Sequence, residues 1–86
     1  MDYKNNMLEH NIKLKVKNNK TNQSVSIDKF ILRQFRWDLR TSNVIIDVDY
    51  YYDEKHLFTN EFIYEEMEEV IVDKLIKDIV RKHYES

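Results

Sequence analysis

Residues 44–52 read Val-Ile-Ile-Asp-Val-Asp-Tyr-Tyr-Tyr, and this stretch decides the fold class. Side chains of a β-strand point alternately to its two faces. One face of this stretch would carry Val44, Ile46, Val48, Tyr50 and Tyr52, and the other Ile45, Asp47, Asp49 and Tyr51. An apolar face opposite a face with two aspartates predicts a central antiparallel strand with one side covered by the core.

A β-hairpin is predicted on the N-terminal side of this strand. From Asn11 onward, apolar Ile12, Leu14 and Val16 alternate with Lys13, Lys15 and Lys17, which indicates a half-buried strand. The Asn-rich residues 18–22 are typical of a turn. The apolar residues at 25 and 27 then predict a short second strand, which completes the hairpin.

Residues 28–40 are expected to form a helix. Asp28 is suited to the N-cap position, because its carboxylate can accept the free N–H groups of the first turn. An apolar face at helical spacing would consist of Ile31, Leu32, Phe35 and Leu39. The opposite face would be basic and flanked by Phe30 and Trp37, and it would consist of Lys29, Arg33, Arg36 and Arg40.

A fourth strand and a second helix are predicted after the central strand. Residues 53–55 suit a turn, 57–63 a returning strand and 64–84 a helix. The helix prediction rests on Met67, Ile71, Leu75 and Ile79, which recur every four residues. Alternatively Asn60 caps this helix, which then starts near Glu61 and removes the fourth strand. The strand is favoured because Phe58, Phe62 and Ile63 suit it.

These elements predict an α+β fold in ββαββα order, with one small antiparallel sheet and two helices packed on one of its faces. A chain of 86 residues has room for one hydrophobic core. Residues 11–86 are therefore expected to form a single domain, and residues 1–10 a loose N-terminal arm.

The composition excludes several kinds of site. Glycine, proline, alanine and cysteine are all missing. The codons of the first three begin with two G or C bases, so their absence is expected for an AT-rich genome such as that of a phage or plasmid of low-GC bacteria. Without glycine there is no P-loop, dinucleotide fingerprint or nucleophile elbow, and left-handed turn positions must be taken by Asn or Asp. His10, His56 and His83 lie in different elements, so we expect no metal site, no cofactor and no enzymatic activity.

The location is predicted from absences as well. No apolar run approaches the roughly 20 residues that span a bilayer. The first six residues are polar, unlike a signal peptide, and there is no cysteine for a disulfide framework. A cytoplasmic protein without a membrane anchor is the simplest interpretation.

Charge differs between the two halves of the chain. Residues 1–42 hold nine Lys/Arg and four Asp/Glu, a net charge of +5, whereas residues 43–86 hold five and twelve, a net charge of −7. The acidic half contains a Tyr-rich candidate site for protein binding: Asp47, Asp49, Tyr51, Asp53, Glu54, Glu61, Glu65, Glu66, Glu68 and Glu69. Such a surface could mimic nucleic acid toward a protein that presents Lys and Arg.

A simpler interpretation is that the acidic face is only solvated. Asp47 and Asp49 would then pair across the sheet with Lys13 and Lys15, and the Glu run would serve the helix dipole.

The basic half contains a candidate nucleic-acid site. Arginines on one face beside an aromatic ring can hold phosphates and stack on bases. This set consists of Lys13, Lys15, Lys17, Lys29, Arg33, Arg36, Trp37 and Arg40. The alternative is an ordinary exposed helix face.

The stretches Asp47–Glu54 and Glu65–Glu69 carry a resemblance to the small phage anti-CRISPR proteins, through size, composition and acidic Tyr-rich character. Some members of that group block a nuclease by covering its DNA-binding groove with acidic residues. The resemblance implies a phage or mobile-element inhibitor of a host nuclease or other nucleic-acid-binding protein. The alternative is a small DNA-binding regulator or plasmid accessory protein, and either could be a homodimer.

Overall fold

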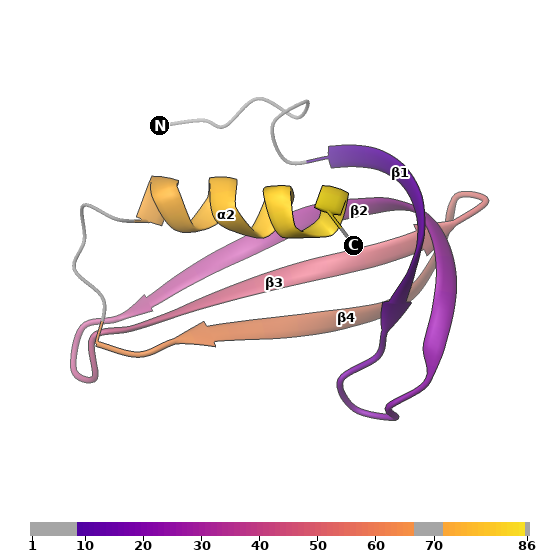
Figure 1. The fold of residues 1–86 in the computed structure, drawn as a ribbon. Coiled ribbons are helices and arrows are strands. Elements are labelled where there is room, and N and C mark those ends of the chain that lie inside the picture. Colours follow the sequence, from indigo (N-terminus) through magenta and orange to yellow (C-terminus); the bar gives the residue numbers. More distant parts are fainter. Residues whose placement is uncertain (1–8, 67–71, 86) are drawn as a thin grey trace.

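The computed structural model describes residues 9–66 and 72–85, and it has an α+β fold (Figure 1). Four antiparallel strands form a meander in the order β1-β2-β3-β4, followed by one helix. Their bounds are β1 Glu9–Lys17, β2 Ser24–Asp38, β3 Asn43–Tyr52, β4 Lys55–Tyr64 and α2 Val72–Glu85. The α+β class and the antiparallel sheet are confirmed, but the ββαββα order with two helices is wrong.

Strand β3 lies between β2 and β4, as residues 44–52 predicted. Its side chains at 44, 46, 48 and 50 are fully buried in the core. Tyr52 is half exposed at the end of the strand. The alternation therefore predicted both the strand and its covered face.

The expected helix over residues 28–40 is the main error, because residues 28–38 continue β2 as one long strand. Leu39, which the helix would bury, is 83% exposed. The residues of β2 that face the core are instead Ile27, Phe30, Leu32, Phe35 and Trp37. Tertiary pairing overrides the helical pattern here, since β3 gains its second neighbour only if these residues are extended.

Irregularities in the pairing explain why the alternation of β2 is hidden in the sequence. The register between β2 and β3 shifts between Leu32 and Gln34, and that between β1 and β2 shifts near Ile27. A β-bulge adds one residue to a strand and breaks its period of two. The extra residue between Leu32 and Gln34 lies in β2 and separates core-facing Leu32 and Phe35 by three positions, whereas the extra residue of the other irregularity lies in β1. The core-facing residues of β2 are separated by three, two, three and two positions, which imitates a helical spacing.

Strand β4 is confirmed, and the alternative helix start near Glu61 is wrong. The predicted start of the helix at residue 64 is also wrong, because Tyr64 is the last residue of β4. Residues 67–71 of the predicted helix lie outside the described residues. The loose arm was predicted over residues 1–10. Residues 9 and 10 belong to β1 instead, and residues 1–8 lie outside the described residues.

Helix α2 runs across one face of the sheet and closes the core (Figure 1). Leu75, Ile76 and Ile79 are buried against the core-facing side chains of the strands, as their spacing predicted. The other face of the sheet carries no described helix. We call it the open face.

The sheet is strongly curled, so that β1 and the first half of β2 bend toward the core side (Figure 1). Asn60 on β4 holds the end of this hairpin, although β1 and β4 are the two edges of the sheet. Its Nδ2 donates to the carbonyl of Lys17 and its Oδ1 accepts from the N–H of Asn19, both at 3.0 Å. Asn60 is only 3% exposed.

The turns use left-handed residues without glycine. Asn22 and Asp53 have positive φ, as predicted for residue types that tolerate this conformation. Ser42, Glu54 and Glu66 also have positive φ, so the prediction that only Asn or Asp takes such positions is wrong. Asp53 and Glu54 together form the two-residue connection between paired Tyr52 and Lys55, where both central residues of a type I′ turn need positive φ.

Candidate functional site on the open sheet face

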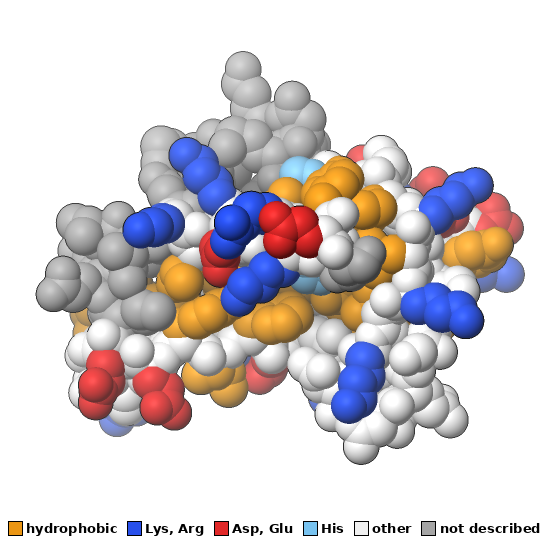
Figure 2. Space-filling view, in the orientation of Figure 1, with side chains coloured by type: hydrophobic (Ala, Val, Ile, Leu, Met, Phe, Trp, Pro, Cys, Tyr) orange, Lys and Arg blue, Asp and Glu red, His pale blue; other side chains and the backbone are white. Residues whose placement is uncertain are grey.

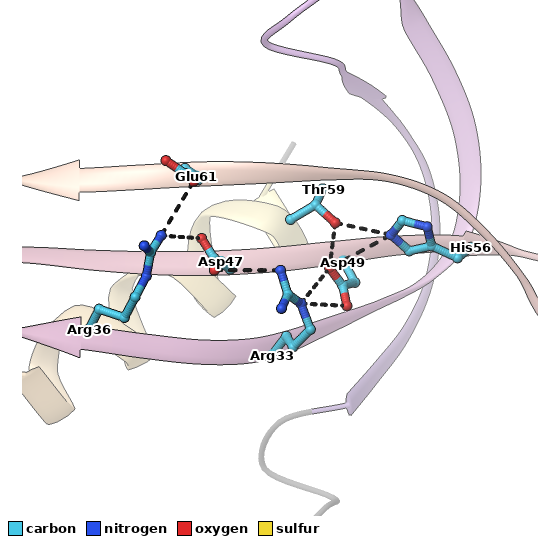
Figure 3. A network of polar contacts seen from close by, with 7 residues as sticks. All are labelled: Arg33, Arg36, Asp47, Asp49, His56, Thr59 and Glu61. Carbon is cyan, nitrogen blue, oxygen red and sulfur yellow. Dashed lines mark hydrogen bonds and ion pairs between the residues drawn. The ribbon is translucent and has the colours of Figure 1, made fainter.

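Asp49 and Arg33 form the centre of a polar network on the open face (Figure 3). They lie on neighbouring strands, β3 and β2. The Arg33 Nε lies 3.1 Å from Oδ1 and 3.0 Å from Oδ2 of Asp49. Asp49 is only 6% exposed, whereas the Arg33 side chain is 49% exposed, so the guanidinium lies over the carboxylate. The hydrogen bond and the charge of Asp49 raise the pKa of Arg33.

Asp47 extends this network along β3 to a second arginine. Its Oδ2 lies 3.5 Å from the Nη2 of Arg33, and its Oδ1 lies 3.4 Å from the Nη2 of Arg36. The same Nη2 of Arg36 lies 3.3 Å from Oε2 of Glu61 on β4. Asp47 is 4% exposed, so its charge too is covered and compensated. The network thus joins β2, β3 and β4 across the sheet.

Thr59 and His56 complete the network on β4. The Thr59 hydroxyl donates to Oδ1 of Asp49, so its oxygen accepts the hydrogen bond from His56 Nε2 at 3.0 Å. A catalytic hydroxyl would need the opposite direction, donating its proton to a histidine that acts as base. This arrangement orders the sheet and does not activate a nucleophile.

The predicted acidic site is not assembled as expected. Asp47 and Asp49 are covered by arginines, and the predicted pairing of these aspartates with Lys13 and Lys15 is wrong, because β2 lies between β1 and β3. Tyr51 is half-buried, with the ammonium of Lys29 4.9 Å from its ring centroid.

The remaining members of the acidic set are dispersed. Glu54 pairs with Lys29, and Asp53 lies beside it in the turn before β4. Glu65 and Glu66 are exposed after the opposite end of β4. Glu68 and Glu69 lie outside the described residues. Over residues 9–66 and 72–85, the acidic set therefore forms no continuous surface.

The predicted basic set divides into compensated and uncompensated members. Lys29, Arg33 and Arg36 do share one face, through the bulge in β2, but each pairs with a carboxylate. Arg40 pairs with Asp38 after the strand. Trp37 packs toward the core and therefore lies on the opposite face from Arg36, so it is not beside the arginines.

Four lysines at the β1 edge carry positive charge that the described residues do not compensate. Lys13, Lys15 and Lys17 are exposed on the side of β1 away from the core, and Lys20 follows in the turn. We call these four residues the lysine row. None of them forms an ion pair with another described residue. The sequence did not single out Lys20, whose only signal was its place in the turn next to the basic strand.

The surroundings of the lysine row differ between its two ends. Asp28 and Asp53 line the same hollow as Lys13 and Lys15, which lowers the positive potential there. The hollow that Lys17 lines together with Lys15 has no Asp or Glu among its described lining residues. In Figure 2, the lower right of the molecule, over the end of β1 and the following turn, carries blue side chains and no red ones.

Neither a metal site nor a membrane-spanning helix is found in the described part of the chain. No group of three or more His, Asp or Glu side chains there is arranged to hold a metal ion. None of its helices has the length and apolarity needed to cross a bilayer. Comparison with protein-family models, curated proteins and solved structures finds no significant match.

Proposed function

We propose that this protein is a non-enzymatic binding protein whose lysine row contacts the phosphate backbone of a nucleic acid. One observation carries the proposal. Arg33 and Arg36 are compensated by Asp47 and Asp49, whereas the lysines of β1 and its turn have no ion-pair partner among the described residues. This favours a small DNA-binding protein over an inhibitor whose acidic surface mimics nucleic acid.

The geometry of an extended strand suits a polyanion. Lys13, Lys15 and Lys17 occupy alternate positions of β1 and are exposed on the same side, at a spacing of about 6.6 Å along an extended strand. Lysine ammonium groups that replace condensed counterions on phosphates give binding that weakens steeply as salt rises. The overall net charge of −2 limits long-range attraction, so contact depends on this local row.

The test compares two triple charge reversals. In the first variant Lys13, Lys15 and Lys17 become Glu; in the control, exposed Lys55, Lys74 and Lys77 become Glu. Fluorescence anisotropy with a labelled duplex and a labelled single strand is measured across a salt series. Each lost phosphate contact lowers the slope of log affinity against log salt by about 0.9 for duplex or 0.7 for single-stranded DNA. The row variant should lose about 2 to 3 units of slope, and the control should keep the wild-type slope.

Two results would contradict the proposal. One is an absence of wild-type binding at low salt. The other is an equal loss in both variants, which would mean that net charge and not the row decides binding. Circular dichroism spectra must be unchanged, as expected for exposed charges that contribute little to stability.

A second candidate function is inhibition of a host nucleic-acid-binding protein, as the resemblance to anti-CRISPR proteins implies. It is supported by exposed Glu65 and Glu66, which have no ion pair with another described residue, next to half-exposed Glu61. If this candidate is correct, the protein should compete with DNA for its target and should not bind DNA itself. Reversal of Glu61, Glu65 and Glu66 to Lys should then abolish the competition, while the lysine-row variant retains it.

A further inference from the structure

A cavity of about 270 Å³ opens between the edge of β1, strand β4 and the end of α2. It exists because Asn60 holds the curled β1–β2 hairpin near β4 without continuous strand pairing between them. Leu14 and Val16 from β1 and Phe62 from β4 supply its apolar lining. These three side chains pack against the core and are only partly buried, so they leave apolar surface at the cavity.

Three of the uncharged polar residues that line the cavity are buried and held in place, whereas the fourth, Asn19, is exposed. The three are Tyr50, Asn60 and His83, and each of them is less than 9% exposed. The Tyr50 hydroxyl lies 2.7 Å from His83 Nε2, and His83 Nδ1 lies 2.8 Å from the carbonyl oxygen of Ile79. Asn60 is fixed by its two hydrogen bonds to the hairpin. A ligand would therefore meet a preformed surface.

Among the described residues, the charged side chains around the cavity are cationic. Lys15, Lys17 and Lys82 line it, and no Asp or Glu of the described part does. Lys82 also pairs with Asp78 at 3.3 Å, but Asp78 is not part of the lining. An anion in the cavity would be stabilised by this field, whereas a cation would be repelled.

We propose that this cavity binds a small ligand that consists of one apolar ring bearing a single phosphate or carboxylate group. The apolar lining supplies contact for the ring. Lys82 on α2 supplies the charge for the anion, and Lys15 and Lys17, whose side chains leave β1 on the side away from the core, add positive charge at the rim. The volume lies just below the range of about 300–1,000 Å³ for drug-sized ligands, which restricts the occupant to a single ring with its substituent.

Four probes test the two parts of this chemistry. Phenyl phosphate and benzoate combine a ring with an anion, benzyl alcohol has the ring alone, and inorganic phosphate has the anion alone. Binding is followed by heteronuclear NMR of the labelled full chain, using the side-chain amide of Asn60 and the backbone amides of Val16 and Phe62. Phenyl phosphate or benzoate should bind about tenfold more tightly than benzyl alcohol and inorganic phosphate do. A tenfold change in affinity is a difference of about 1.4 kcal/mol in binding free energy.

A pair of variants on α2 localises the anion. Lys82→Glu should weaken binding of the better probe about tenfold, since it places a negative charge at the cavity. Lys77→Glu makes the same charge change on the same helix at an exposed residue outside the lining, and it should change affinity less than twofold. Neither residue belongs to the lysine row, so these results are independent of nucleic-acid binding.

Three results would overturn the proposal. The first is the absence of saturable chemical-shift changes at the cavity with either phenyl phosphate or benzoate up to about 10 mM. The second is an affinity for benzyl alcohol equal to that for the better charged probe. The third is an equal loss of affinity for that probe in Lys82→Glu and Lys77→Glu. Stronger binding of phenyl phosphate than of benzoate would assign the phosphate form of the ligand, and the reverse would assign the carboxylate form.

Discussion

The hydroxyl of Tyr50 on β3 donates a hydrogen bond to Nε2 of His83 on α2, at 2.7 Å. The direction follows from the other ring nitrogen: His83 Nδ1 lies 2.8 Å from the carbonyl oxygen of Ile79, so Nδ1 carries the proton and Nε2 accepts. Burial raises the pKa of Tyr50 and lowers that of His83, which keeps both groups neutral. This bond joins the central strand to the helix inside the core.

Stability should fall as the pH drops below about 6.5, because of His83. Burial lowers the pKa of His83 in the folded protein, and nearby His10 adds to this effect, whereas the hydrogen bond to Ile79 opposes it. Between the folded value and about 6.5 the unfolded chain binds a proton that the folded chain does not. The unfolding free energy should therefore decrease by up to about 1.4 kcal/mol per pH unit.

The contribution of His83 can be isolated with His83→Gln, which does not titrate. Urea unfolding of both proteins is measured from about pH 7 to pH 5, above the range in which most carboxylates titrate. His10 and His56 are present in both proteins, so the difference in slope belongs to position 83. Equal slopes would mean that His83 is protonated as readily in the fold as in the unfolded chain.

Removal of Arg33 should destabilise the sheet far more than removal of Arg40. Arg33→Met leaves the nearly buried carboxylate of Asp49 without its main cation, and we expect a loss of about 1–3 kcal/mol. Arg40→Met removes an ion pair in which the arginine side chain is 91% exposed, and such pairs contribute about 0–1 kcal/mol. Chemical denaturation of the two variants checks the difference, and similar losses would contradict the structural role of the network.

Asn60→Ala should release the end of the β1–β2 hairpin. The change removes both hydrogen bonds between β4 and residues 17 and 19, and it leaves their backbone groups partly buried. We expect a cost of about 1–3 kcal/mol and faster amide exchange at Asn19. Asn18→Ala is the matched control, since its side chain makes only an exposed local bond to the N–H of Lys20. Unchanged exchange at Asn19 in the Asn60 variant would show that the hairpin does not depend on this bond.

Glu54→Gly should stabilise the protein although it removes a salt bridge. Glu54 has φ of 64°, which costs a residue with a Cβ about 1–2 kcal/mol, and glycine adopts this conformation without strain. The unfolded chain gains entropy from glycine, so the expected net gain is about 0.5–1 kcal/mol. The change also removes the ion pair between Glu54 and Lys29. The Glu54 side chain is highly exposed, so this pair contributes little to stability. A lower melting temperature of Glu54→Gly would contradict this.

The elements predicted correctly are those whose own pattern was sufficient. From residue 44 to 50 every second side chain is buried in the core, and in α2 the buried residues Leu75 and Ile79 keep the four-residue spacing. Regular periodicity reflects a regular backbone with one buried side, which is why these elements could be predicted locally. The same holds for the strand character of residues 11–17.

Strand β2 and the open-face network depended on the tertiary structure. The bulge of β2 after Leu32 disguises its alternation, and the extended form of residues 28–38 is stabilised by pairing with β1 and β3, which lie elsewhere in the sequence. Only in this pairing do Arg33 and Arg36 lie next to Asp47 and Asp49 and cancel their charge. The sequence by itself determined which residues are charged and which strand is central. The register between strands decided which charges are compensated, because that depends on distances between side chains far apart along the chain.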